Sequence, residues 1–117
     1  MKKMLIVIER APYGTSLPAE AFRMAIGLAG MEDEVSVLLA QDGVFAALAD
    51  QRPDALGMKS IGEALDGLGE FGVRLYALDR SLEERGLDRD RLIPNVEVVG
   101  PDACRRLIEQ ADGVVGF

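Results

Sequence analysis

The 117-residue chain has no histidine, no tryptophan and only one cysteine. Without histidine it lacks the commonest general base and zinc ligand, which excludes serine–histidine and cysteine–histidine catalysis within one chain. One cysteine cannot form an internal disulfide. Aromatic residues make up only 5% of the chain, so its core must be built from Leu, Val, Ile and Ala.

Basic charge and long apolar runs are also scarce. With 13 Lys and Arg against 20 Asp and Glu, the net charge is −7. Such a surface repels phosphate groups, so we expect no direct nucleic-acid binding and no binding to a membrane. The apolar run at 4–8 is too short for a signal peptide, and no run approaches the roughly 20 residues of a membrane span. We therefore expect a cytoplasmic protein.

The sequence also carries no pattern for a cofactor or a metal. Its glycines form neither a G-x-G-x-x-G nor a Walker motif, and its carboxylates lack the spacing of a calcium loop. Neighbouring Glu83 and Glu84 would diverge on a helix, so they do not form an acid–base pair. We predict no cofactor and no metal site.

Hydrophobic residues make up 49% of the chain and alternate between two kinds of pattern. Continuous apolar runs predict strands at 4–8, 34–40, 73–78, 96–99 and 112–117. Helical periodicity fills the intervals between these runs. Strands alternating with helices require crossover connections, so the pattern predicts an α/β fold with a parallel sheet between two helical layers. We find no linker, and we expect a single domain over 1–117.

The predicted helices have recognisable ends and apolar faces. One helix buries Phe22, Ala25, Ile26 and Ala29, with Ser16 as its cap, and stops at Gly30. Asp42 is the expected N-cap of a second helix, through Val44, Phe45, Leu48 and Ala49. Ser60 and Glu63 form a capping box for a third, with an inner face of Ile61, Ala64, Leu65, Leu68 and Phe71. A short charged helix follows the strand at 73–78 and ends at Gly86, and Pro101 begins the last helix.

Four motifs occur in an order and spacing that resemble a known family. They are Ala11-Pro-Tyr-Gly-Thr15, Asp42-Gly-Val-Phe45 followed by Asp50-Gln-Arg-Pro-Asp54, Ser81-Leu-Glu-Glu-Arg-Gly-Leu87, and the ending Ala111–Phe117. The chain resembles the DsrE/DsrF/TusD sulfur-relay family over nearly its whole length, and the TusC/DsrF branch in particular. The resemblance implies a flavodoxin-like, three-layer α/β/α domain with a five-stranded, mainly parallel sheet.

The resemblance also implies assembly with other chains. Members of the family form homotrimers and homohexamers, or heterohexamers with DsrE/TusD-like and DsrH/TusB-like subunits. These complexes pass persulfide sulfur toward thiolation of a tRNA uridine or through cytoplasmic sulfur oxidation. The motifs leave open which pathway, and whether the partners are those subunits or further copies of this chain.

One side chain decides how the resemblance is interpreted. In the family, a cysteine just past the third strand carries the sulfur, and Leu78 is at the matching position here. Sulfur transfer needs a thiolate, which leucine cannot supply. We therefore expect a supporting subunit without independent catalytic activity, while a DsrE/TusD-like chain carries the sulfur. Two alternatives stay open: a self-assembling relative that binds a small ligand, and a sulfurtransferase that uses Cys104.

Cys104 is more simply explained as a packing residue. With Leu107, Ile108 and Ala111 it forms the i, i+3, i+4, i+7 face of the last predicted helix. This face should point into the core, where burial raises the pKa of a thiol and makes it inert.

The remaining candidates each have a structural and a functional interpretation. Arg85 could steer an anionic sulfur species or a partner carboxylate, but we favour an exposed arginine paired with Glu84 or Asp88. Asp79 and Ser81, like Asp42, are better explained as helix-start caps than as catalytic groups. Tyr13 fits an interface and a site equally well. The candidate ligand- or partner-binding residues are Tyr13, Asp42, Leu78, Asp79, Ser81 and Arg85.

Overall fold

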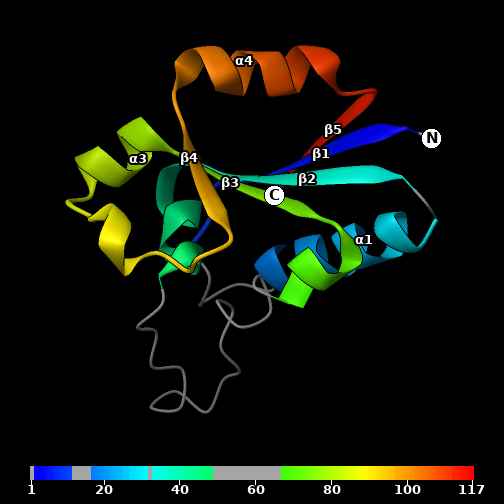
Figure 1. Cartoon of the computed structure of the whole chain (residues 1–117), viewed down its shortest axis with the longest axis horizontal. Helices are drawn as coiled ribbons and strands as arrows, with labels where there is room; N and C mark the ends of the chain where they lie inside the picture. The colour runs from blue at the N-terminus through cyan, green and yellow to red at the C-terminus, as the bar shows by residue number, and fades with distance from the viewer. Residues whose placement is uncertain (1, 12–16, 32, 49–66) are drawn as a thin grey trace.

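The computed structural model describes residues 2–11, 17–31, 33–48 and 67–117 (Figure 1). In this part of the chain, five strands form one parallel sheet. They are β1 (Lys3–Ile8), β2 (Glu34–Leu39), β3 (Arg74–Leu78), β4 (Val96–Val99) and β5 (Gly113–Gly116). All five predicted strands are confirmed, and no predicted end differs from the observed one by more than one residue.

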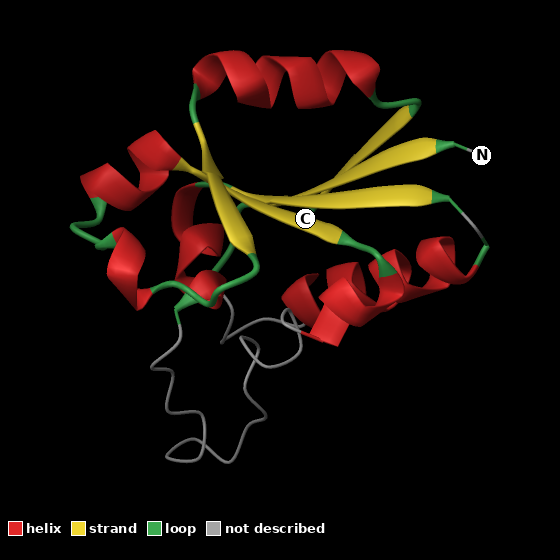
Figure 2. Cartoon of the chain, viewed as in Figure 1, coloured by secondary structure: helices red, strands yellow, loops and turns green. Residues whose placement is uncertain are grey.

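The sheet has the order β4-β3-β2-β1-β5. The chain advances in one direction from β1 to β4, and the last strand then returns to the free side of β1. Helices cover both faces, so the predicted three-layer α/β/α class is confirmed (Figure 2). The likeness to flavodoxin lies in these layers, because flavodoxin itself has the strand order 2-1-3-4-5.

Two long helices lie on opposite faces of the sheet (Figure 1). Helix α1 (Leu17–Gly30) covers one face, and α4 (Pro101–Gln110) covers the other. Short helices connect the strands: η1 (Gln41–Ala47), η3 (Gly69–Phe71), α3 (Asp79–Glu84) and η4 (Arg89–Arg91). Gly86, at φ 64°, reverses the chain after α3, as its place at the end of that helix predicts.

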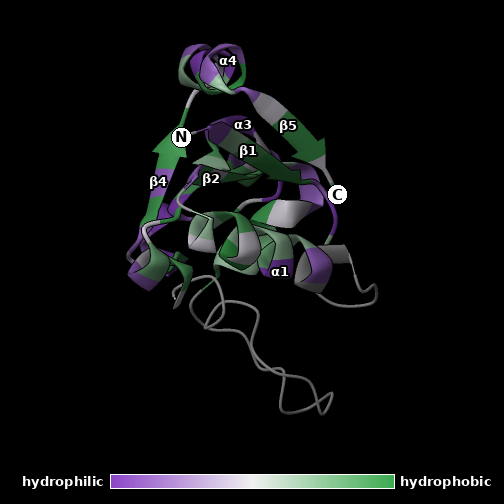
Figure 3. Cartoon of the chain, turned by 90° about the vertical axis from the view of Figure 1, so that its right-hand side faces the viewer, coloured by the Kyte–Doolittle hydropathy of each residue, from purple (hydrophilic) through white to green (hydrophobic). Residues whose placement is uncertain are grey.

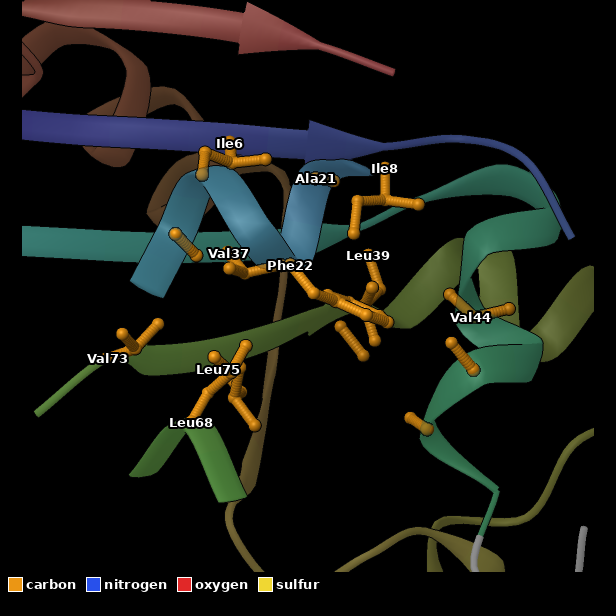
Figure 4. Packing of buried hydrophobic residues seen from close by; sticks show 14 of the residues in the cluster. Ile6, Ile8, Ala21, Phe22, Val37, Leu39, Val44, Leu68, Val73 and Leu75 are labelled. Carbon is orange, nitrogen blue, oxygen red and sulfur yellow. The ribbon is translucent and has the colours of Figure 1, made fainter. Parts of the chain in front are cut away.

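Because strand side chains alternate between faces, the core has two parts. Figure 4 shows Ile6, Ile8, Val37, Leu39 and Leu75 packed with Ala21 and Phe22 of α1. On the other face, a smaller cluster of Leu5, Leu38, Tyr76 and Val99 packs against Ala103, Cys104 and Leu107 of α4. Hydrophilic residues occupy much of α4 (Figure 3). The apolar cluster under α4 is therefore the smaller of the two.

Two residues predicted to face the core beside α1 do not. Ile26 is 42% exposed and Phe71 is 56% exposed, whereas Phe22, Ala25 and Leu68 are buried. Ile26 lies about 90° around the helix from the centre of the buried stripe of α1. Phe71 lies in the 3-10 turn η3, where α-helical spacing no longer determines direction.

The helix predicted after Asp42 also differs in form. It is the 3-10 helix η1, which stops at Ala47, and Leu48 instead makes an antiparallel bridge with Leu92. Most of the motif Ala11–Thr15, the motif Asp50–Asp54, the cap at Ser16 and the capping box of Ser60 and Glu63 lie outside the described residues. In the described part of the chain, no helix is long and apolar enough to cross a membrane.

Candidate functional site

The predicted site lies at the carboxyl ends of two neighbouring strands. Strand β2 leads through Ala40 into η1, and β3 leads directly from Leu78 into α3. Since β2 and β3 are parallel and paired, η1 and α3 begin at the same edge of the sheet and contact each other. This edge is where ligands bind in open parallel sheets.

Helix η1 is packed against the end of β1. A Cβ atom on Gly43 would lie 2.0 Å from the backbone oxygen of Ile8, so only glycine fits at this position. Gln41, the first residue of η1 and two positions before Gly43, has φ 51°, a conformation that is uncommon for a residue with a side chain. The Ser81 hydroxyl accepts the Gln41 backbone N–H at 2.9 Å and supports this turn.

Arg85 joins η1 to α3. Its Nε donates to the Asp42 carboxylate at 3.0 Å, its Nη1 to the Ser81 carbonyl at 3.2 Å, and its Nη2 to the Gln41 amide oxygen at 3.4 Å. The Glu84 carboxylate lies 3.8 Å from Nη1. Only 19% of the Arg85 side chain is exposed. The guanidinium is therefore fixed by groups of this chain.

These contacts change the interpretation of three predicted residues. Asp42 was expected to cap its own helix, but the N-cap of η1 is Ala40 and the Asp42 carboxylate pairs with Arg85. Ser81 was expected to cap α3, but it is buried inside α3 and satisfies the first amide of η1. Arg85 does approach Glu84, yet it is half-buried and its shorter ion pair is with Asp42. The prediction missed Asp42 because 43 residues separate it from Arg85.

Leu78 is the residue just before α3. It is half-buried and has an extended backbone, φ −75° and ψ 125°, which makes it the N-cap residue of that helix. Asp79 was expected to cap α3, but it is the first residue of that helix, and its carboxylate accepts the N–H of the next residue, Arg80, at 2.5 Å. A thiol at position 78 would thus lie at the mouth of the β3–α3 turn, and an aliphatic side chain lies there instead.

An apolar hollow of about 520 Å³ opens between Leu78 and α4. Its exposed surface is mostly apolar, although three charged side chains border it. The lining residues are Leu78, Arg80, Pro101, Cys104, Arg105, Ile108 and Glu109. Ile108 is 47% exposed. The hollow is therefore an accessible apolar surface next to the candidate site.

Cys104 borders this hollow and is only half-buried. The expected inward face of α4 is thus only partly buried, because no other described helix lies beside α4 to cover its flanks. Burial still raises the pKa of the Cys104 thiol, as predicted. Arg105 does not counter this effect through an ion pair, since its guanidinium pairs with Asp102 at 2.7 Å.

The structure adds less about the other predicted site residues. Tyr13 lies outside the described residues. Within the described residues, no group of three or more His, Cys, Asp or Glu side chains could hold a metal ion. Gln41 was missed by the sequence analysis, because nothing in its local sequence marks it as a partner of Arg85. That the remaining candidates bind a ligand or partner stays a prediction.

A profile of the DsrE/DsrF-like family matches residues 2–117 of the chain. The chain belongs to the DsrE/DsrF-like family. It is 31% identical to the intracellular sulfur oxidation protein DsrF of Allochromatium vinosum, over 100% of this chain and 97% of the relative. It is 34% identical to the TusC homolog of Pseudomonas aeruginosa, over 97% of both chains.

The fold of this DsrE/DsrF-like chain is also found among solved structures. The crystal structure of the ychN protein from E. coli superimposes with a TM-score of 0.90 and 28% sequence identity, covering 100% of both chains. The prediction of the family and of its TusC/DsrF branch is therefore confirmed.

Proposed function

We propose that this chain is a DsrF/TusC-like subunit of a cytoplasmic sulfur-relay complex, in which it supports persulfide transfer without accepting sulfur itself. The observation that carries the proposal is Leu78. It lies at the carboxyl end of β3 and at the start of α3, where the resemblance of the Ser81–Leu87 motif to the family predicts the sulfur-accepting cysteine. A leucine side chain has no atom that can form a persulfide.

Two further features of the site support a non-catalytic role. The Cys104 thiol has a raised pKa, so little of it is thiolate near neutral pH. The Arg85 guanidinium is held by Asp42, Ser81 and Gln41, and is not free to bind an anionic sulfur species. The hydrogen bonds of Arg85 therefore hold the carboxyl edge of β2 and β3 in one conformation.

The apolar hollow supports a role in assembly. Leu78 and Ile108 offer aliphatic surface at the edge where a partner's persulfide would arrive. We propose DsrE/TusD-like and DsrH/TusB-like subunits as the partners; a homotrimer or homohexamer is the alternative. The relay would lead either to tRNA thiolation or to sulfur oxidation, the role stated in the name of the DsrF relative.

A persulfide-transfer assay tests the absence of a sulfur-accepting thiol. The folded protein is incubated with a persulfide donor and its intact mass is measured. We expect no stable sulfur adduct on the native sequence. The variant Leu78→Cys in a Cys104→Ser background should gain one sulfur, because its thiol lies at the start of α3. Cys104→Ser alone is the matched control.

Cys104 supports a second candidate function, because it borders the same hollow as Leu78. In this sulfurtransferase, the Cys104 thiolate attacks the outer sulfur of a donor persulfide. A new S–S bond forms, the donor S–S bond breaks, and the donor leaves as a thiolate. A stoichiometric adduct on the native protein that is lost in Cys104→Ser would establish this function and refute the non-catalytic proposal.

A further inference from the structure

A second pocket lies away from the carboxyl edge, under the C-terminal half of α4. It has a volume of about 130 Å³ and is closed from above by Leu107, Gln110 and Ala111. Its floor comes from the first residues of three strands: Lys3, Met4, Leu5, Glu34, Ser36, Arg74 and Tyr76. Figure 1 shows this end of α4 over the amino-terminal half of the sheet. The pocket is thus at the opposite end of the strands from Leu78.

The register of the sheet brings its polar side chains together. Ser36 pairs with Arg74 across β2 and β3, and Tyr76 follows two residues later on the same face of β3. Lys3 pairs with Glu34 across β1 and β2. Two cationic groups, one carboxylate and two hydroxyls therefore point to the face covered by α4.

Tyr76 is the most informative member of this group. Its side chain is packed in the apolar cluster beneath α4, and the residue is only 8% exposed. No described residue forms a hydrogen bond or ion pair with the Tyr76 hydroxyl or with the side chains of Ser36 and Arg74. Among the described residues, no side-chain oxygen is both fully buried and without a partner, so the Tyr76 hydroxyl reaches open space. The Tyr76 ring is thus fixed by packing while its hydroxyl is accessible to a molecule in the pocket.

We propose that this pocket binds a small oxyanion, a carboxylate or an inorganic anion, held by Arg74 and by the hydroxyls of Tyr76 and Ser36. Arginine matches the geometry of a two-oxygen anion, and two hydroxyl donors complete its hydrogen bonds. Glu34 at the pocket wall adds selectivity for ligands that also carry a cationic or donor group. At roughly 30 Å³ for each water-sized group, the volume of about 130 Å³ fits a small molecule of about four such groups.

The pocket has an adjoining hollow at the sheet edge. Arg74 and Tyr76 also border this second hollow, which extends over β4 to Glu70, Asn95 and Glu97. In this hollow the carboxylates of Glu70 and Glu97 outnumber Arg74, whereas in the pocket under α4 Lys3 and Arg74 outnumber Glu34, so the oxyanion is expected on the Ser36 side. Ser36 and Lys3 line only the pocket under α4, and they therefore distinguish the two places.

Titration of the full-length protein with sulfate and, separately, with malonate tests the proposal. Backbone amide shifts are followed by NMR. We expect saturable shifts at Ser36, Arg74 and Tyr76. Preference for malonate would identify a carboxylate ligand, and preference for sulfate an inorganic anion; both would support the site. No saturable shift at these residues with either probe would overturn it.

Three variants and one control sharpen the experiment. Arg74→Gln should weaken binding at least about tenfold, the usual effect of losing a charged hydrogen bond. Tyr76→Phe, which keeps the ring, and Ser36→Ala should each weaken binding about threefold to tenfold. Arg80→Gln removes an exposed arginine outside the pocket and should leave binding unchanged. Equal weakening by Arg80→Gln and Arg74→Gln would mean general charge attraction and would refute the site.

Discussion

At the residue scale, the carboxyl edge depends on one guanidinium. Arg85 is largely enclosed; its Nε and Nη2 have acceptors in η1, and its Nη1 has one in α3. Hydrogen bonds to a charged group contribute more to stability than neutral ones, typically about 1.5–3 kcal/mol each when one partner is removed. An exposed ion pair contributes little by comparison. Arg85 therefore acts as a positioning residue for the turn before Gly43.

Replacing Arg85 by glutamine should lower the free energy of unfolding by about 1–2 kcal/mol, chiefly because the part-buried Ser81 carbonyl loses its donor; Asp42 and Gln41 are exposed and can bind water instead. Arg105→Gln is the matched control, since it removes an exposed pair with Asp102 and should cost less than about 0.5 kcal/mol. Urea unfolding monitored by circular dichroism measures both. Equal effects of the two substitutions would contradict the positioning role.

Cys104 should alkylate slowly near neutral pH. Its pKa lies above the ordinary value of 9.0 because burial disfavours the thiolate. Below that pKa the thiolate fraction rises about tenfold per pH unit, so the rate with iodoacetamide should still increase as the pH passes 9. Intact-mass measurements over time give the rate, and the urea-unfolded chain, which should level off earlier, is the control. A plateau below pH 8 in the folded protein would show an activated thiol.

At the scale of elements, η1 is positioned by contact rather than by its own sequence. The absence of a side chain at Gly43 lets its backbone lie against the Ile8 carbonyl, and that contact brings Asp42 within reach of Arg85. The strands need no such help, because continuous apolar runs specify buried parallel strands on their own. All five strands were therefore predictable from the sequence, as were the starts of α3 and α4.

The form of η1 and the partners of Asp42 and Ser81 were not predictable. An aspartate followed by glycine after a strand favours a cap locally, and only the pairing of β2 with β3 brings residues about 40 positions apart together. The half-exposure of Cys104 has a similar cause: periodicity gives the direction of a helical face but not how far neighbouring elements cover it. The position of Leu78, fixed by the end of a clear strand, was predictable.

Alanine at Gly43 should destabilise the fold by about 3 kcal/mol or more, since its Cβ would overlap backbone atoms that cannot move aside. Gly27→Ala is a matched control inside α1, where nothing lies within 4 Å of the added Cβ. That substitution should stabilise the protein by about 0.5–1 kcal/mol through helix propensity. Thermal unfolding of the two variants provides the comparison, and a native-like Gly43→Ala would disprove the close approach of η1 to β1.

At the scale of the whole molecule, the two faces of the sheet are unequally covered. Helix α1 lies over the large apolar cluster, whereas α4 rests on a smaller one and leaves Ile108 accessible beside Leu78. An apolar surface next to charged side chains is typical of an interaction site. This face is therefore the surface at which we expect the proposed partner chains to bind.

Ile108→Asp should abolish co-purification with DsrE-like and DsrH-like subunits, or the self-association of the chain. Placing a carboxylate in an apolar contact leaves a desolvated charge without a partner. Ile26→Asp is the matched control: Ile26 is exposed to a similar degree, but it lies on α1 at the opposite face. Solution mass with and without the partners measures assembly. Loss of assembly in both variants, or in neither, would exclude the hollow as the interface.

The pairing of β5 with β1 has a consequence for synthesis in the cell. Strand β1 is synthesised well before β5, which is one of its two neighbours in the sheet. At ~5–20 residues per second, that edge of β1 stays open for roughly 5–20 s, during which another nascent chain or a chaperone can occupy it. Phe117 donates its N–H to Val7 and accepts one from Glu9, so a chain that lacks the segment from β5 to Phe117 would carry an unpaired, aggregation-prone edge on β1.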